Sequence, residues 1–296
     1  MLDQVQNPLD DEHFQSLVPE VKLDRRGFIA GAIAAGFAVT AAPVMAQAIK
    51  TPMDGLEGGD VQIPSAYGSV PAYYAVPKGT GKRPIVIVVP EIWGLHEYIK
   101  DTCRRLAKAG YFAIANEPYS RIGELWKMTE IKEVLASANK LTDEQAFLDN
   151  DATLAWAAAH KRGNGAKIGI TGFCRGGRMV WMYSAYSKKI KAGVAWYGGL
   201  NPSMPAQPNT PLDIADQLKA PILGLYGGAD TGIPQVMVDR MRAALLAFGK
   251  DKESMIHVYE GMPHAFHADY RPSYRKEAAD DGWKRMLAWF KKHGVA

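Results

Sequence analysis

The sequence is poor in cysteine, with only Cys103 and Cys174 among 296 residues. Two cysteines exclude a disulfide-rich scaffold, and no C-x-x-C pair is present for a thiol redox site of the common type. The formal net charge is only +4. No basic run interleaved with aromatic residues occurs, so nucleic acid is not an expected partner. Neither a cluster of metal ligands nor a phosphate-cradling glycine loop is evident, and we therefore expect no cofactor.

The overall composition is that of an ordinary globular protein. Hydrophobic residues make up 47% of the chain and charged residues 22%. A chain of this length and balance can bury a sizeable core, either in one large α/β domain or in two smaller ones.

Long apolar runs are also lacking, and the one near the N-terminus is short. Residues 24–48 contain the pair Arg25-Arg26, a weakly apolar Ala/Gly-rich run over 27–42, and then small residues. A membrane anchor is the alternative, but it needs ~20 apolar residues. We therefore predict that residues 1–48 are a cleavable twin-arginine export signal. The expected location is periplasmic or secreted, with the export machinery as partner and only transient membrane contact through this segment.

The remainder, residues 49–296, is predicted to form one doubly wound, mostly parallel α/β domain. Residues 85–89 are a continuous β-branched run, which is typical of a strand buried on both faces of a parallel sheet. Strand and helix patterns then alternate with short links. Two long insertions, 120–143 and 199–218, should lie over the carboxyl ends of the strands. The patterns predict strands within 60–76 (a pair joined by a turn), 85–89, 111–119, 167–173, 192–198, 220–227 and 254–260, and helices at 97–109, 145–160, 178–188, 235–248 and 274–293.

The segment Gly172-Phe173-Cys174-Arg175-Gly176 lies between a predicted strand and a predicted helix. Gly-x-Ser-x-Gly in that context is a nucleophile elbow, and here cysteine replaces serine. Glycines flank the nucleophile because its backbone is strained and neighbouring Cβ atoms would clash. The start of the following helix lowers a thiol pKa and presents N–H groups to an anion. The alternative is a small buried cysteine at a tight turn.

Candidate partners follow in the order nucleophile, acid, histidine, which is the order in hydrolases of this type. Asp230 comes just after one predicted strand and His264 just after the next. His267 competes for the base role, whereas His257 lies inside a strand and is interpreted as packed or solvent-facing. Asp239 is a rival acid within a predicted helix, and Asp230 could instead be a turn or capping residue.

A third candidate feature is the loop that follows residues 85–89. It contains Glu91, Ile92 and Trp93. In this position the loop should supply the second oxyanion donor, a backbone N–H. Glu91 places a carboxylate at the same sheet edge as the nucleophile, although it could simply be a helix N-terminal charge.

Together these segments resemble the dienelactone hydrolases, or carboxymethylenebutenolidases. The resemblance covers roughly residues 60–293, and its four motifs occur in the order of the family. It implies an α/β-hydrolase fold and a catalytic triad of Cys174, Asp230 and His264. The motifs are PIVIVVPEIWGLHEYIKDTCRRLAKAGYFAIANEPY, ITGFCRGGR, YGGAD and the segment that begins MPHAFHADYRPSY.

The resemblance also implies roles for the loop and for the helix start. Glu91 would turn toward Cys174 when substrate binds and help to generate the thiolate. The backbone N–H groups of Ile92 and Arg175 would hold the oxyanion.

Two positions depart from the family pattern. Dienelactone-cleaving members carry a substrate-binding arginine four residues after the histidine, where this chain has Ala268. Arg271 is the candidate replacement, and Trp93 is a further candidate for substrate contact. Arg175 stands where those enzymes carry an apolar residue. These departures and the export signal argue against dienelactone itself as the substrate.

The leading hypothesis is hydrolysis of a carboxylic ester or lactone through a cysteine acyl-enzyme, without a cofactor. Two alternatives remain. One is a binding protein of the same fold that has lost activity. The other is a thiol redox protein using Cys174 and Cys103.

Overall fold

The computed structural model describes residues 49–128, 130–201 and 205–296. The predicted export signal, residues 1–48, lies outside the described residues. Within the described ranges, every helix is too short or too polar to span a bilayer.

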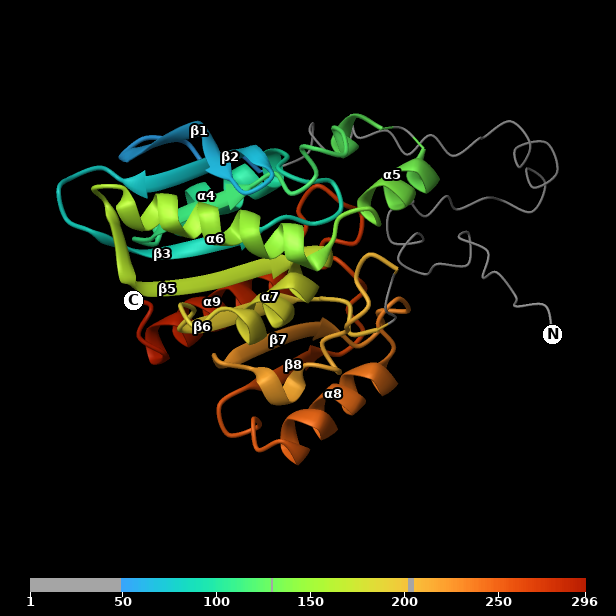
Figure 1. The fold of residues 1–296 in the computed structure, drawn as a ribbon. Helices are drawn as coiled ribbons and strands as arrows, with labels where there is room; N and C mark the ends of the chain where they lie inside the picture. The colour runs from blue at the N-terminus through green and yellow to red at the C-terminus, as the bar shows by residue number, and fades with distance from the viewer. Residues whose placement is uncertain (1–48, 129, 202–204) are drawn as a thin grey trace.

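One sheet runs through the described part of the chain (Figure 1). Its strand order is β1-β2-β4-β3-β5-β6-β7-β8. The pairs β1–β2 and β2–β4 are antiparallel, and all the other neighbours are parallel. The strands are β1 (Leu56–Ser65), β2 (Gly68–Pro77), β3 (Arg83–Val89), β4 (Phe112–Asn116), β5 (Gly163–Phe173), β6 (Ala192–Trp196), β7 (Ile222–Gly227) and β8 (Met255–Tyr259).

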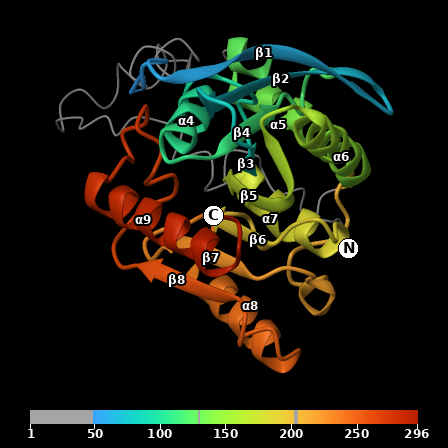
Figure 2. The ribbon, with the colours of Figure 1, turned by 90° about the vertical axis from the view of Figure 1, so that its left-hand side faces the viewer.

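Helices cover both faces of this sheet. Figure 2 shows α4 and α9 on one face and α6, α7 and α8 on the other. This layering, with the parallel strands, is the predicted doubly wound α/β-hydrolase architecture. The helices are α4 (Glu97–Lys108), α5 (Ile131–Ala138), α6 (Asp143–Ala159), α7 (Arg175–Tyr186), α8 (Gln235–Ala247) and α9 (Lys276–Lys292), with short 3₁₀ turns η2 (Leu125–Lys127) and η3 (Ala215–Gln217).

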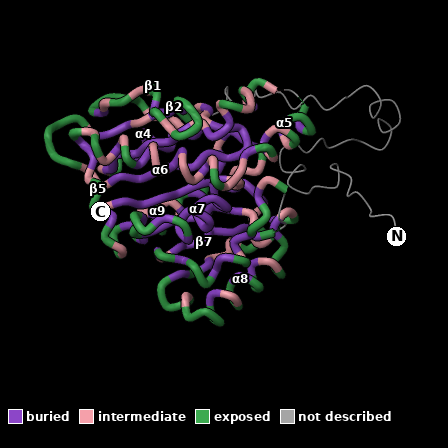
Figure 3. The backbone as a smooth tube through the Cα atoms, in the orientation of Figure 1, coloured by how far each residue is buried: buried purple, intermediate pink, exposed green. Residues whose placement is uncertain are grey.

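The sheet forms the centre of the hydrophobic core (Figure 3). Ile85 to Val88 of β3 are completely shielded from solvent, as the β-branched run predicts. The helix α4 turns Ile99, Cys103 and Leu106 toward this core at helical spacing. The parallel pairing of β4, β3, β5, β6, β7 and β8 places the carboxyl ends of these strands at one edge of the sheet.

The carboxyl ends of the parallel strands gather the candidate residues. Glu91 follows β3, Cys174 follows β5, Asp230 follows β7 and His264 follows β8. Both predicted insertions reach this edge, since a pocket there is lined by Leu141 and Gln207 as well as by strand-end residues. The insertions contain η2, α5 and η3.

The helix after the elbow begins earlier than predicted. The sequence pattern predicts a helix from residue 178, but α7 begins at Arg175. Gly176 and Gly177 favour a loop by propensity, yet here they are needed for close packing. A Cβ on Gly177 would lie 2.5 Å from the carbonyl oxygen of Trp196, so only glycine lets the helix start this close to the sheet.

Candidate active site

Cys174 occupies a strained turn between β5 and α7. Its φ is 53° and its ψ is −114°. A non-glycine residue in that region costs about 1–3 kcal/mol and persists only where the surroundings hold it. The Cys174 N–H donates to the carbonyl of Trp196 at 3.0 Å, and its carbonyl accepts from the N–H of Arg178 at 3.0 Å. The thiol is only partly shielded. This is the geometry of a nucleophile elbow.

The glycines of the elbow allow the chain to pack against the loop after β3. A Cβ on Gly172 would lie 2.3 Å from the carbonyl oxygen of Gly176. A Cβ on Gly176 would lie 2.2 Å from the Val89 oxygen and 2.6 Å from the Pro90 oxygen. The elbow therefore lies directly against the loop that carries Glu91, which brings two of the predicted features together.

Asp230 and His264 form a buried pair. His264 Nδ1 lies 2.7 Å from Asp230 Oδ2. The other carboxylate oxygen, Oδ1, accepts the N–H groups of Gly232 at 3.0 Å and Ile233 at 3.1 Å. These backbone donors fix the carboxylate, and the carboxylate in turn fixes the orientation of the imidazole ring.

The charge on His264 links the pair to Cys174. Burial by itself would lower the pKa of His264, but the charges of Asp230 and Cys174, and hydrogen bonds with both, raise it to about 10. An imidazolium next to a thiol is an arrangement that occurs in thiol enzymes. The three side chains are thus electrostatically coupled.

The rival residues lie in other environments. His267 is buried, with Nδ1 2.6 Å from the Tyr98 hydroxyl, and burial lowers its pKa to about 3. Asp239 is an exposed partner of Arg242. His257 is partly buried on β8. His264, and not His267, is the histidine beside Asp230.

Glu91 is completely buried in a network that the sequence does not reveal. Its Oε2 accepts from Arg271 at 2.7 Å, and its Oε1 lies 3.0 Å from His96 Nε2. The Tyr270 hydroxyl donates to Oε1 and accepts from Arg271 Nε at 2.8 Å. His96 and Tyr270 both lie within the family-like motifs, but nothing in their spacing indicates that they meet at one carboxylate.

The network keeps Glu91 ionised. Burial by itself would raise the pKa of Glu91. The charge of Arg271 has the largest opposing effect, followed by the interactions with His96 and His264, and together they bring the pKa below its ordinary value. Arg271, a candidate for substrate contact, therefore lies against Glu91 in this structure.

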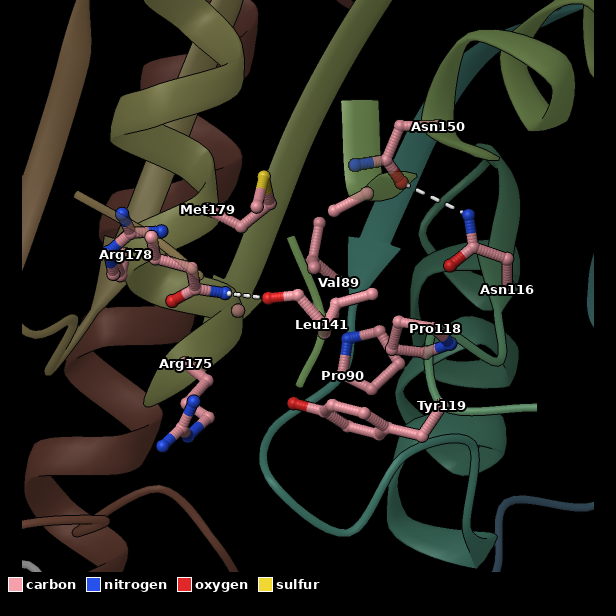
Figure 4. A pocket seen from close by; sticks show the side chains of 13 residues that line it. Val89, Pro90, Asn116, Pro118, Tyr119, Leu141, Asn150, Arg175, Arg178 and Met179 are labelled. Atoms are coloured by element: carbon pink, nitrogen blue, oxygen red, sulfur yellow. Dashed lines mark hydrogen bonds between the residues drawn. The ribbon is translucent and has the colours of Figure 1, made fainter. Parts of the chain in front are cut away.

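A small pocket lies next to the elbow (Figure 4). Tyr119 extends across it toward Arg175, whose guanidinium donates to Asn139 Oδ1. Arg178 forms two hydrogen bonds to Asp143, at 2.6 and 2.9 Å. The lining residues are Val89, Pro90, Asn116, Pro118, Tyr119, Leu141, Ala146, Asn150, Arg175, Gly176, Arg178, Met179 and Gln207.

The pocket has a volume of about 30 Å³, which is room for about two water molecules. A larger cavity of about 260 Å³ lies between α4 and α9, but neither Cys174 nor His264 lines it. Cys174 and His264 do not line the smaller pocket either, but Arg175 and Gly176 of the elbow do. Trp93 lines neither cavity and is 1% exposed, so its predicted substrate contact stays a prediction.

Across the described ranges, no group of three or more His, Cys, Asp or Glu side chains is placed to hold a metal ion.

Comparison with known proteins identifies the family. The model of the dienelactone hydrolase family matches residues 70–294. The chain belongs to the dienelactone hydrolase family. The predicted family and the α/β-hydrolase fold are therefore confirmed, and the activity that goes with the family is hydrolysis of an ester or lactone.

Full-length relatives support this assignment. A Methylorubrum extorquens protein named "Putative carboxymethylenebutenolidase" is 49% identical over 97% of this chain and 99% of its own length. An Escherichia coli K12 protein with the same name is 47% identical over 88% of this chain and 96% of its own length. A Klebsiella pneumoniae crystal structure described as a putative dienelactone hydrolase has 47% identity and a TM-score of 0.77, covering 80% of this chain and 98% of the other.

Proposed function

We propose that this protein hydrolyses a carboxylic ester or lactone through an acyl-enzyme on Cys174. The observation that carries the proposal is the coupling of a thiol on a strained elbow to an imidazole that Asp230 holds at 2.7 Å. In family members with this order of residues, such a thiol is the nucleophile.

The reaction would proceed in two halves. The Cys174 thiolate attacks the carbonyl carbon, and the N–H groups of Ile92 and Arg175 stabilise the oxyanion. One such donor is typically worth about 3 kcal/mol of the barrier. When the intermediate collapses, the C–O bond to the alcohol breaks and His264 gives that oxygen its proton. Neutral His264 then takes a proton from water, the water attacks the thioester, and the thiolate leaves.

Glu91 has a proposed role in activation. Its carboxylate is ionised and bonded to Arg271 in the described state. Substrate binding would release it from Arg271 so that it turns toward Cys174 and accepts the thiol proton. The position of Glu91 on the loop that packs against the elbow supports this role.

The pocket next to the elbow, which is lined by Arg175 and Gly176, suggests which substrates fit. Its volume of about 30 Å³ admits only a substituent of a few heavy atoms. The Arg175 guanidinium borders this pocket and donates to the side-chain oxygen of Asn139. Because the basic side chain of Arg175 lines this pocket, a small polar or anionic group on the acyl side is the preferred substituent, and a panel of esters and lactones with and without a free carboxylate tests this.

Export remains a proposal based on residues 1–48. The twin arginine Arg25-Arg26 before a short apolar run supports a periplasmic or secreted enzyme. Fractionation of cells that produce the full chain or the Arg25→Lys/Arg26→Lys variant tests this. Retention of the variant in the cytoplasm is expected, and unchanged export of the variant would overturn the proposal.

Acyl-enzyme trapping is the direct test of the function. The purified protein is incubated with an activated aryl ester and quenched in acid for peptide mass spectrometry. We expect the acyl group on Cys174 and no turnover by Cys174→Ala. Full esterase activity in that variant would exclude the thiol mechanism. Binding of substrate without turnover would instead favour a catalytically inactive binding protein.

A further inference from the structure

Glu117 is a carboxylate at the active-site edge that the proposed mechanism does not use. It directly follows β4, at the same end of the sheet as Cys174. Its Oε2 accepts the backbone N–H of Leu95 at 2.6 Å, and its Oε1 accepts the backbone N–H of Tyr119 at 2.9 Å. The side chain thereby joins its own segment to the loop after β3, since Leu95 lies 22 residues earlier in the sequence.

The loop after β3 is shaped around this carboxylate. Gly94 has a φ of +72°, and a Cβ there would lie 2.3 and 2.4 Å from the two Glu117 oxygens. The same loop is closed by hydrogen bonds from Gly94 N–H to the Glu91 carbonyl and from His96 N–H to the Gly94 carbonyl, both 3.0 Å. The Glu117 carboxylate occupies the space that a side chain at position 94 would need.

Both segments held by Glu117 carry or adjoin residues with proposed roles in the reaction. The loop carries Glu91 and the proposed oxyanion donor Ile92, and Tyr119 lines the pocket beside Arg175. We propose that Glu117 is a positioning residue that aligns the oxyanion loop and Tyr119 with Cys174. The inference rests on the proposed function, because it assumes that Ile92 N–H meets the reacting carbonyl.

The charge of Glu117 makes the role testable by pH. Burial raises the pKa of Glu117 to about 7, and nearby Glu124 adds to this, while the Leu95 and Tyr119 hydrogen bonds and Lys100 of α4 lower it. On the loop itself, the titratable side chains are Glu91 and His96, which bond each other. Protonation below pH 7 replaces an acceptor oxygen by a hydroxyl and weakens the hold on the loop, so the rate falls.

The experiment measures kcat and KM of the full chain from pH 5.5 to 9 with the aryl ester that acylates Cys174. For Glu117→Gln we expect kcat at pH 8 to fall about tenfold or more, since one N–H loses its charged acceptor. KM should change less than threefold. The acid limb of the pH–rate profile, which is the fall in rate below about pH 7, should disappear. Glu117→Asp should keep such a limb at a lower rate. Glu124→Gln removes a nearby exposed carboxylate that makes no bond to the loop, and it should keep the wild-type kcat.

Wild-type kcat together with an unchanged acid limb in Glu117→Gln would overturn the inference while acylation of Cys174 still occurred. Failure of acylation in the wild type would overturn the proposed function instead. If Glu117→Gln does not fold, Gly94→Ala displaces the carboxylate without removing its charge, and an unaltered kcat in that variant would equally contradict the inference.

Discussion

His264 and Asp230 are 34 residues apart in the chain but share a 2.7 Å contact at the carboxyl edge of the sheet. Asp230 is itself held by two backbone N–H groups, so its carboxylate has a fixed orientation toward the imidazole ring. Asp230 therefore orients the imidazole of His264, which is the proposed base.

Replacement of Asp230 by Asn should therefore lower kcat by about 10³- to 10⁴-fold with little change in KM, because the imidazole would take the wrong tautomer. Steady-state kinetics with an ester substrate checks this. Asp239→Asn is the matched control, since Asp239 is exposed and pairs only with residues of its own helix. Comparable losses in both variants would contradict the role of Asp230.

The raised pKa of His264 predicts a pH-dependent stability. The pKa is about 10 in the folded protein against an ordinary 6.5. Because the pKa is raised in the folded protein, protonated His264 stabilises the fold fully below pH 6.5. This stabilisation is lost as the pH rises toward 10. Denaturant unfolding of the wild type and His264→Gln at pH 6, 8 and 10 should give a difference that shrinks with pH. A difference that is constant or grows would show that His264 is neutral in the fold.

The two cysteines should differ sharply in reactivity. Cys103 is fully buried on α4, and burial raises its thiol pKa far above the ordinary value, whereas Cys174 is partly exposed. Brief alkylation of the native protein at pH 7 should label Cys174 alone, as peptide mass spectrometry would show. Equal labelling, or a disulfide between the two thiols, would favour the redox alternative.

Gly176 should not tolerate a side chain. In Gly176→Ala the new Cβ would overlap the carbonyl oxygens of Val89 and Pro90 and push the oxyanion loop away from the elbow. We expect a fall in kcat of at least tenfold and a stability loss of about 1–3 kcal/mol from overpacking. Gly81→Ala is the control, because a Cβ there has open space. Thermal unfolding and kinetics of both variants would show whether the elbow is as tightly packed as described.

The buried ion pair of Glu91 and Arg271 should show strong coupling. Removal of either charge leaves the other buried, and such a loss costs about 3–5 kcal/mol. The double variant Glu91→Gln/Arg271→Met should lose much less than the sum of the single variants. A double-mutant cycle on free energies of unfolding measures this. Additive losses would mean that the two side chains do not interact in solution.

The sequence by itself determined the architecture and the positions of the main candidates. The β-branched run of β3 and the alternation of strands and helices are local patterns, and periodicity predicts them without knowledge of the fold. The family-like motifs placed Glu91, Cys174, Asp230 and His264 after four different strands. Because parallel strands end at one edge, the motifs implied that these residues meet. The start of α7 was misplaced because the glycines there are required by packing against the sheet, which propensity does not report.

Only the tertiary structure decided which neighbours each side chain has. His264 and His267 are three residues apart, and the sequence favours His264 without excluding His267. In the structure the loop turns His264 toward Asp230 and buries His267 against Tyr98. The assembly of Arg271, Tyr270 and His96 around Glu91 joins residues about 180 positions apart. The position of the Glu117 carboxylate against Gly94 likewise follows from the close approach of two loops. Such contacts depend on the packing of helices on the sheet, and no local pattern encodes them.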